Sequence, residues 1–258
     1  RPTLNLLIAA TTAEEMLGVE PEMNVMPAIY LDQMVEVLGT SSHAFHTDLI
    51  DYFSAMQSRT TSLIIPIARL TMNAEKAMHL LEGAAVFKGD VMVGELDITE
   101  TRGVLWTKGG VQGGVINIGI DDGIASMEIA GSSVSAAPIV AADGKVSINI
   151  SISADLKLSE QTCTTNLATQ ENLKKLTELA GWSITRSVEL ALEKAKALRA
   201  DVFGFGELVH RRRNDVWEGM EPDWEEIFQE LTVNVEVETR VVSVGAIDQP
   251  VWDREHRP

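Results

Sequence analysis

Hydrophobic and polar residues alternate most clearly in VSINISISA, residues 146–154. A period of two predicts a β-strand with one face in the core and the other face wet or lightly covered. Residues 115–120 and 232–242 alternate in the same way and predict two more strands. An Asp-Asp-Gly turn follows 115–120, so we expect residues 124–135 to return antiparallel, with Gly131 at a bulge. The second half of the chain is therefore expected to contain a sheet.

The longest helical pattern covers residues 171–199, where apolar side chains recur every three or four positions. These side chains are Leu173, Leu176, Ala180, Ile184, Val188, Ala191, Ala195 and Leu198. Lysine and glutamate occupy much of the opposite face, so we expect an amphipathic helix that covers the hydrophobic face of the sheet. Gly181 is the position at which we expect a kink or a division of this helix.

The first 60 residues mix a short apolar run with helical patterns. Residues 4–10 form a continuous apolar run that predicts a buried strand, and Thr12 and Glu15 have the spacing of a capping box at a helix start. A second helix is predicted with Tyr30, Met34, Val37 and Leu38 on its apolar face. A third is predicted from Thr47, with Leu49, Ile50, Phe53 and Met56 as its apolar stripe.

Residues 62–70 again predict a strand, which Pro66 limits to a sheet edge or a bulge. Residues 80–96 predict two strands joined at a Lys-Gly-Asp turn. One or two helical turns are expected between Thr99 and Trp106, before the glycine-rich stretch 108–114.

These elements predict an α+β protein of several domains, each a mostly antiparallel β-sheet packed with helices. The long helix is expected on the sheet of the C-terminal domain. The expected divisions are the remainder of a truncated N-terminal domain at 1–75, a small middle domain at 76–114, a C-terminal domain at 115–248 and a tail at 249–258.

The composition narrows the classes of function. A formal net charge of −17 argues against a general nucleic-acid binder, because phosphate contacts require a positive face. No apolar run approaches the roughly 18 residues that a membrane span needs. The chain opens on an apolar run without a signal segment, so we expect a soluble fragment that begins inside a domain. Cys163 is the single cysteine and excludes an internal disulfide framework.

The reactive residues do not form a recognisable catalytic or metal-binding set. His43 and His46 lack a third ligand in register, and the stretch 108–114 lacks the Lys-Ser/Thr of a phosphate loop, which favours a hairpin or an interdomain turn. Glu225 and Glu226 are adjacent on a predicted helix and favour its positive end rather than a pair of catalytic carboxylates. We therefore expect no catalytic residue, no cofactor and no metal.

Residues 200–242 form the most unusual segment: a Phe-Gly-Phe-Gly turn, a basic helix, an acidic helix headed by tryptophan and an alternating strand. Its glycines permit backbone geometry closed to other residues, and its aromatic side chains are expected to plug a sheet–helix junction. We expect the following motif residues to act mainly in folding: Asp201, Phe203, Gly204, Phe205, Gly206, Glu207, Trp224 and Phe228.

The basic patch, His210, Arg211, Arg212 and Arg213, is the one concentrated positive cluster in this acidic sequence. Two interpretations stay open. It is either a solvated helix face paired with nearby acids such as Glu207, Asp215 and Glu218, or a docking patch for an acidic partner surface or lipid headgroups. The composition does not choose between them.

Three segments resemble the C subunit of bacterial spore germinant receptors, the Ger(x)C lipoprotein family. They are LEGAAVFKGDVMVGEL with the following ETRGVLWTKG, then VSINISISADL with the long helix, and most specifically ADVFGFGELVHRRRNDVW with PDWEEIF and VNVEVETRVVSVGAI. The first 70 residues resemble the latter part of the family's N-terminal domain, so the resemblance spans nearly the whole chain.

The resemblance implies a non-enzymatic lipoprotein subunit on the outer face of the inner spore membrane. With two integral-membrane subunits it would form a complex that senses nutrients and starts germination. The lipobox and its lipidated cysteine are absent from this sequence, so the resemblance implies a soluble fragment that lacks the N-terminal lipid anchor. Cys163 lies too far along the chain to be that anchor.

Two other hypotheses belong to different classes. The protein could be a small-ligand binding module that senses the nutrient germinant directly, which requires an apolar pocket with convergent polar groups. It could also be a hydrolase that uses Glu225 or Glu226, which requires one of them in a cleft with a partner carboxylate.

Overall fold

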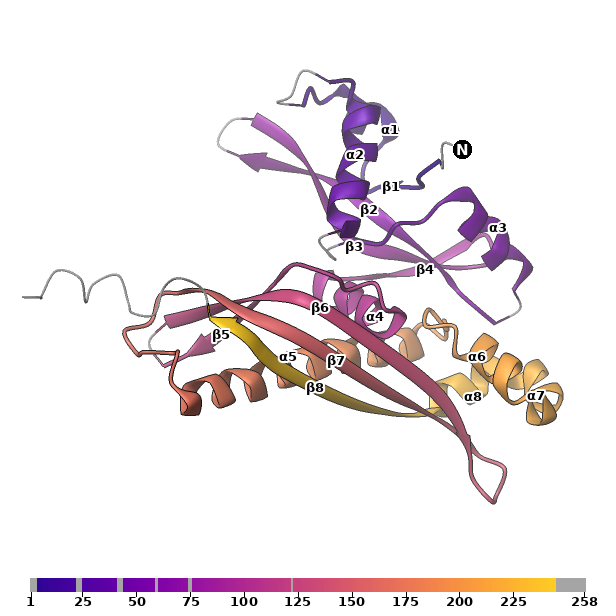
Figure 1. Ribbon diagram of the computed structural model, residues 1–258. Helices are drawn as coiled ribbons and strands as arrows, with labels where there is room; N and C mark the ends of the chain where they lie inside the picture. The colour runs from indigo at the N-terminus through magenta and orange to yellow at the C-terminus, as the bar shows by residue number, and fades with distance from the viewer. Residues whose placement is uncertain are drawn as a thin grey trace, which may run out of the picture.

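The computed structural model describes residues 4–21, 25–40, 44–58, 60–73, 76–121 and 123–244. Two four-stranded β-sheets and the helices packed on them make up the described chain (Figure 1). In Figure 1 the first sheet and α1–α3 lie above the second sheet, with α4 between them. The predicted α+β class is confirmed, whereas the predicted tail at 249–258 lies outside the described residues.

The first sheet has the order β1-β2-β3-β4. Its strands are β1 (Ile8–Ala9), β2 (Leu63–Asn73), β3 (Lys76–Lys88) and β4 (Val91–Leu96). The β1 strand pairs parallel with β2, and the other two pairs are antiparallel. Pro66 lies where the register between β2 and β3 shifts, in a strand with neighbours on both sides, so it marks a bulge and not an edge. The strand predicted at 4–10 is much shorter than expected: Ile8 and Ala9 pair with β2, and Asn5 forms only an isolated bridge with Asp48.

Three helices accompany this sheet: α1 (Ala13–Gly18), α2 (Pro27–Thr40) and α3 (Leu49–Gln57). The predicted capping box of α1 is confirmed, since Glu15 N–H donates to Thr12 Oγ1 at 3.2 Å and Thr12 N–H donates to Glu15 Oε2 at 3.3 Å. The Asp48 side chain caps α3 by accepting from Ile50 N–H and Asp51 N–H. Local sequence therefore sets where these helices begin.

The apolar faces predicted for α2 and α3 are partly wrong. Leu31 and Val35 are the buried residues of α2, whereas Val37 is 64% exposed and the side chain of Leu38 is not described. The predicted stripe of α3 faces solvent, with Ile50 67% and Phe53 59% exposed. Spacing determines which side chains share a helix face, but it does not determine which face packs on the sheet.

The second sheet has the order β5-β6-β7-β8. Its strands are β5 (Val115–Ile120), β6 (Gly123–Val140), β7 (Val146–Gln161) and β8 (Thr232–Val244). The β8 strand pairs parallel with β7, and the other pairs are antiparallel. Ile148, Ile150 and Ile152 are buried while Asn149 and Ser151 are exposed, so the predicted alternation is confirmed. The predicted bulge at Gly131 is also present as a register shift.

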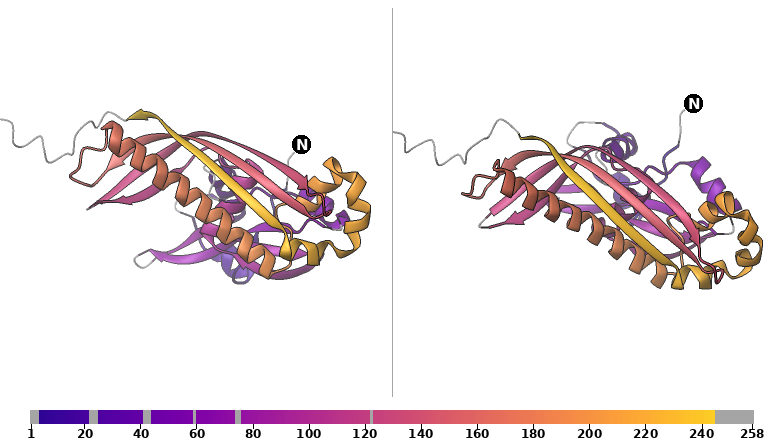
Figure 2. Two further views of the ribbon diagram at one scale, coloured as in Figure 1. Left: turned by 90° about the horizontal axis from the view of Figure 1, so that it is seen from below. Right: turned by 60° about the horizontal axis from the view of Figure 1, so that its bottom comes forward.

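The long helix α5 (Gln170–Ala197) lies diagonally across one face of the second sheet (Figure 2). Its buried residues are Leu176, Ala180, Gly181, Ile184, Val188, Ala191, Leu192 and Ala195, which fits the predicted stripe. Gly181 neither ends nor divides the helix, which runs unbroken past β8. Burial of this stripe against the sheet is the main reason that so long a helix is stable.

The helix α4 (Ile98–Lys108) joins the two sheets. A Cβ atom on Gly103 would lie 2.1 Å from Ser187 O, so glycine permits α4 and α5 to cross at very short range. Ile64, Ala84 and Val86 of the first sheet share one hydrophobic core with the residues of the second sheet. The predicted middle domain at 76–114 contains β3 and β4, which share a sheet with β2; the division into domains stays a prediction.

Four short helices lie at one end of the second sheet, between α5 and β8 (Figure 1). They are α6 (Phe205–Arg212), α7 (Asn214–Met220), the 3-10 helix η1 (Glu221–Asp223) and α8 (Trp224–Glu230). Within the part of the chain that the structure describes, no helix has both the length and the apolar composition for a membrane crossing.

Candidate functional site

The Asp201 carboxylate is the centre of the unusual segment. It is buried at 3% exposure and accepts four hydrogen bonds. Three come from the backbone N–H groups of Gly204, Phe205 and Gly206, at 2.8, 3.1 and 2.8 Å, and the fourth comes from Trp224 Nε1 at 3.1 Å. Burial raises the pKa of the Asp201 carboxyl, while these hydrogen bonds act in the opposite direction.

Aromatic side chains surround this carboxylate. The rings of Phe203 and Phe205 stack with centroids 5.0 Å apart, and Trp217 meets Trp224 edge to face at 5.3 Å. Phe228, one turn after Trp224, is buried as well. These aromatic side chains, which the sequence predicted to plug a sheet–helix junction, lie in the hydrophobic core that the second sheet shares.

Two glycines of the turn are required by geometry. Gly204 has φ of +76°, in the left-handed region that glycine adopts without steric cost. A Cβ atom on Gly206 would lie 2.8 Å from both Trp224 Nε1 and Thr60 Cβ. The turn can therefore wrap around Asp201 only because these positions lack side chains.

The Asp201 junction, meaning Asp201 with the turn and rings around it, also ties distant parts of the chain together. Ser62 N–H donates to Asp201 O at 3.0 Å, and Thr61 forms an isolated parallel bridge with Asp201. Lys108, in the last turn of α4, donates from Nζ to Val202 O at 3.2 Å. The sequence carried no signal for Thr61, Ser62 or Lys108, because these contacts join residues 94 to 140 positions apart.

Glu207, placed with the folding residues in the prediction, lies outside the buried junction. It is exposed on α6, and its carboxylate meets His210 Nδ1 at 3.8 Å and Arg211 Nε at 3.4 Å. Glu207 therefore lies beside the basic patch and pairs with two of its side chains.

The basic patch lies on the exposed side of α6 and at its C-terminal end. His210 stacks on Trp217 with ring centroids 5.7 Å apart. The Arg213 guanidinium donates two hydrogen bonds to the Asp215 carboxylate, of 2.9 and 2.6 Å. These bonds lower the pKa of the Asp215 carboxyl. Arg211 is exposed beyond its contact with Glu207, and Arg212 is exposed with no ion pair among the described residues. The patch therefore combines internally paired charges with guanidinium groups that are open to solvent.

The other candidates from the sequence stand apart from one another. His46 lies 3.5 Å from Glu36, and His43 lies outside the described residues. Gly109 is the left-handed cap of α4, so the stretch 108–114 is the connection from α4 to β5. Cys163 is buried. In the described ranges, no group of three or more His, Cys, Asp or Glu side chains is placed to hold a metal ion.

The hydrolase hypothesis required Glu225 or Glu226 in a cleft with a partner carboxylate. Both side chains are exposed, and Glu225 instead pairs with Lys88 at 2.7 Å between their charged atoms. Adjacent positions in the first turn of α8 point these carboxylates in different directions. Their exposure is not the arrangement that the hydrolase hypothesis required.

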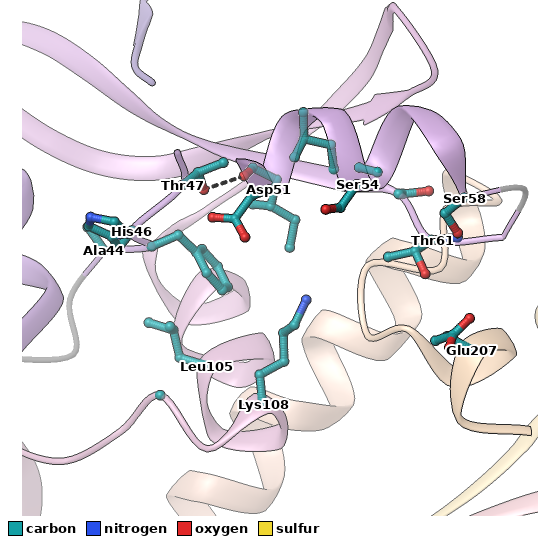
Figure 3. A pocket seen from close by; sticks show the side chains of 16 residues that line it. Ala44, His46, Thr47, Asp51, Ser54, Ser58, Thr61, Leu105, Lys108 and Glu207 are labelled. Atoms are coloured by element: carbon teal, nitrogen blue, oxygen red, sulfur yellow. Dashed lines mark hydrogen bonds between the residues drawn. The ribbon is translucent and has the colours of Figure 1, made fainter. Parts of the chain in front are cut away.

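A pocket of about 610 Å³ opens between α3, the start of β2, the end of α4 and α6 (Figure 3). Apolar walls come from Phe45, Ile64 and Leu105, and charged groups come from Asp51, Lys108 and Glu207. Its volume is within the range of small-molecule sites, and nine of its sixteen lining residues are polar or charged. Sequence reasoning missed this pocket, because its walls come from four separate stretches of chain.

The chain matches known proteins both in sequence and in fold. The model of the family "Spore germination B3/ GerAC like, C-terminal" matches residues 82–245, and that of "Spore germination protein N-terminal domain" matches residues 1–70. The crystal structure of the GerBC protein superposes with a TM-score of 0.73 at 19% identity, covering 92% of this chain and 68% of the other, which shows a shared fold.

Two proteins of Bacillus subtilis (strain 168) are similar in sequence. Spore germination protein B3 is 24% identical over 177 residues, which are 67% of this chain and 47% of that protein. Spore germination protein KC is 23% identical over 180 residues, which are 68% of this chain and 44% of that protein. The chain thus spans about half the length of these relatives. With both family models matched in order and the fold shared, the chain belongs to the GerAC-like family of spore germination proteins, the C-subunit family predicted from its signature segment.

Proposed function

We propose that the protein works as a non-catalytic subunit of a spore germinant receptor and is needed for germination through contacts with the integral-membrane subunits. Family membership supports a role in spore germination. The observation that carries the contact role is the basic patch on α6, which is exposed on a protein of net charge −17 directly after the buried Asp201 junction. In the full-length protein, an N-terminal lipid anchor would hold the subunit on the outer face of the inner spore membrane.

Physical chemistry favours a docking role for this patch. Arginine is enriched at protein interfaces, where its planar guanidinium binds carboxylates through two hydrogen bonds. Complementary charges also speed encounter and select among partners. In an otherwise acidic protein, one basic face orients the approach of an acidic partner surface.

Capture from spore membranes tests this proposal. The tagged full-length lipoprotein is expected to co-purify with the integral-membrane receptor subunits, identified by mass spectrometry, and Arg212→Glu is expected to reduce their recovery. Arg212 suits the test because it has no ion pair among the described residues, so its reversal breaks no contact seen inside the chain. Recovery of the protein without any receptor subunit would overturn the proposal.

The pocket beside α3 favours a second candidate function, the direct binding of a small nutrient. This candidate was expected to require an apolar pocket with convergent polar groups, and the pocket of about 610 Å³ with Phe45, Ile64 and Leu105 in its walls supports it. The two functions can coexist, because none of the four basic-patch residues lines the pocket, although Glu207 of the pocket wall pairs with His210 and Arg211.

A further inference from the structure

The strand β5 has an open edge at one side of the second sheet. Among the described residues, β6 is its only strand neighbour. Gly114 O accepts a hydrogen bond from β6, whereas Val115 O accepts from Arg102 Nη1 of α4 at 2.9 Å. Because paired and unpaired positions alternate along an antiparallel strand, Asn117 and Gly119 also turn their N–H and C=O groups away from β6. These outward backbone groups form the β5 edge.

The two edges of this sheet differ in charge. The outer strand β8 contains Glu236, Glu238 and Arg240, and charges of this kind keep natural edge strands from pairing with other chains. The β5 strand has the sequence VINIGI, with neither a charged residue nor a proline. The β5 edge is thus suited to accept an added strand, as in recognition by β-augmentation.

Arg102 presents an unpartnered guanidinium beside this edge. Its Nη1 serves Val115 O, while Nε and Nη2 are buried and have no hydrogen-bond partner in the described part of the chain. Burial lowers the pKa of Arg102, and no described carboxylate acts in the opposite direction. A buried donor without an acceptor is costly and rare, so these two nitrogen atoms indicate a ligand.

Nε and Nη2 together form the side of a guanidinium that binds both oxygens of a carboxylate. Two other arginines of this protein show the arrangement, Arg213 on Asp215 and Arg240 on Asp155. In each pair, Nε donates to one carboxylate oxygen and Nη2 donates to the other. A carboxylate is therefore the group that matches the unpartnered side of Arg102.

Arg102 lines a pocket of about 350 Å³ where α4, α5 and the start of β5 meet. Thr99, Ser183 and Ser187 add hydroxyl groups to its described lining, which contains no aspartate or glutamate. A carboxylate reaches the buried nitrogen atoms only when lining side chains turn aside, and Ile98 of this lining is 46% exposed and has room to turn into solvent. The pocket therefore offers a cation and hydroxyl groups to an anionic ligand.

We propose that an extended acidic segment of a partner polypeptide adds to the β5 edge and places a glutamate or aspartate side chain against Arg102. The backbone of the segment would pair with Asn117 and Gly119, and its carboxylate would accept from Nε and Nη2 of Arg102. A small carboxylic acid would satisfy the guanidinium but leave the β5 edge unpaired, which favours the polypeptide. This contact is separate from the basic patch and goes beyond the proposed function.

A matched peptide series tests the inference with the whole protein. The probe is the blocked peptide acetyl-TVEVT-amide, for which isothermal titration calorimetry is expected to show saturable binding at one site. Replacing its glutamate by glutamine is expected to weaken binding at least about ten-fold, because the charge-assisted pair is lost. Propionate, the glutamate side chain alone, is expected to bind at least about ten-fold more weakly as well. No binding of the peptide, equal binding of the glutamine form, or propionate binding as tight as the peptide would overturn the inference.

Amide hydrogen exchange locates the peptide on the protein. The bound peptide is expected to slow the exchange of the Asn117 and Gly119 N–H groups, which have no strand partner in the protein alone. The N–H of Ile118 faces β6 and serves as the internal control, so its exchange should change little. Peptide binding without protection of Asn117 and Gly119 would show that the β5 edge is not the site.

Two variants separate the carboxylate contact from the backbone contact. Arg102→Lys keeps the positive charge but lacks the two-nitrogen side of the guanidinium, so peptide binding should weaken about ten-fold or more. Asn117→Pro removes an N–H that points away from β6, so it should block pairing at the β5 edge; within the fold it costs one exposed hydrogen bond, from Ser126 Oγ. Arg240→Lys, on the opposite edge strand, is the matched control and should bind the peptide like the wild-type protein. Wild-type affinity in folded Arg102→Lys or in Asn117→Pro would contradict the assignment.

The failure of this inference is distinguishable from a failure of receptor docking through the basic patch. Absence of peptide binding would reject the β5 edge alone, since co-purification of the receptor subunits with Arg212→Glu reports on the patch.

Discussion

The Asp201 junction and the basic patch are neighbours in sequence and opposites in environment. Asp201 is buried with four donors directed at its carboxylate, whereas Arg211 and Arg212 reach into solvent a few residues later. Hydrogen bonds and ring packing engage the unusual residues around Asp201. The basic patch instead presents guanidinium groups to solvent, and it is the surface for which we propose a contact role.

The largest effect is expected on removing the centre of the Asp201 junction. Asp201→Ala would leave three backbone N–H groups and Trp224 Nε1 without their acceptor in the core, which should lower the free energy of unfolding by about 3 kcal/mol or more. Urea denaturation measures the loss. Glu226→Ala, at an exposed position on α8, is the control, and equal losses in the two variants would contradict the structural role of the junction.

A smaller loss is expected from crowding the turn. In Gly206→Ala the new methyl group would lie 2.8 Å from Trp224 Nε1 and Thr60 Cβ, so it should cost about 1–3 kcal/mol. Gly219→Ala is the matched control: nothing lies within 4 Å of its Cβ position, and alanine favours the helix by up to about 1 kcal/mol. Thermal denaturation should therefore move in opposite directions for the two variants, and a stable Gly206→Ala protein would show that the packing is not tight.

The free energy of unfolding is expected to depend on pH with opposite signs for Asp201 and for Asp215. Burial raises the pKa of Asp201, so the folded state holds this proton at a higher pH than the unfolded state. Its contribution to stability is thus fully present below the ordinary aspartate pKa of about 3.9 and is lost as the pH rises through the folded value.

Asp215, which pairs with Arg213 of the basic patch, behaves the other way. Arg213 lowers its pKa, so its contribution is present above the ordinary aspartate pKa and is lost as the pH falls through the folded value. Unfolding free energies measured against pH for wild type, Asp201→Asn and Asp215→Asn isolate the two contributions. The same sign of pH dependence in both differences would contradict this account.

Much of the architecture could be predicted from local patterns, but tertiary partners could not. The stripe of α5 was predicted and is buried, because a complete sheet face lies next to it. The stripe of α3 has a similar pattern and faces solvent, with no residue of α3 fully buried. Helical spacing carries the same information in both cases, and only the neighbouring surface differs.

The candidate sites show the same limit. Phe205, Trp224 and Phe228 were predicted as core plugs from their type and spacing, and they are buried. The role of Asp201 as a shared acceptor depends on where Trp224 lies in space, 23 positions later. The pocket around Lys108 and Asp51 depends on how α4 and α3 are placed in space, which no local pattern indicates.

The most direct test of the central claim combines stability and assembly in one variant. In the full-length lipoprotein, Arg211→Glu with Arg212→Glu and Arg213→Glu is compared with a control that reverses Lys145, Lys157 and Lys174, so that the net charge changes equally. We predict that both variants stay folded, with a small drop in the unfolding midpoint from the surface ion pairs that each loses, and that the co-purified receptor subunits are lost only when the basic patch is reversed. Unfolding of the patch variant, or full recovery of the receptor subunits with it, would contradict the claim that this surface serves assembly and not folding.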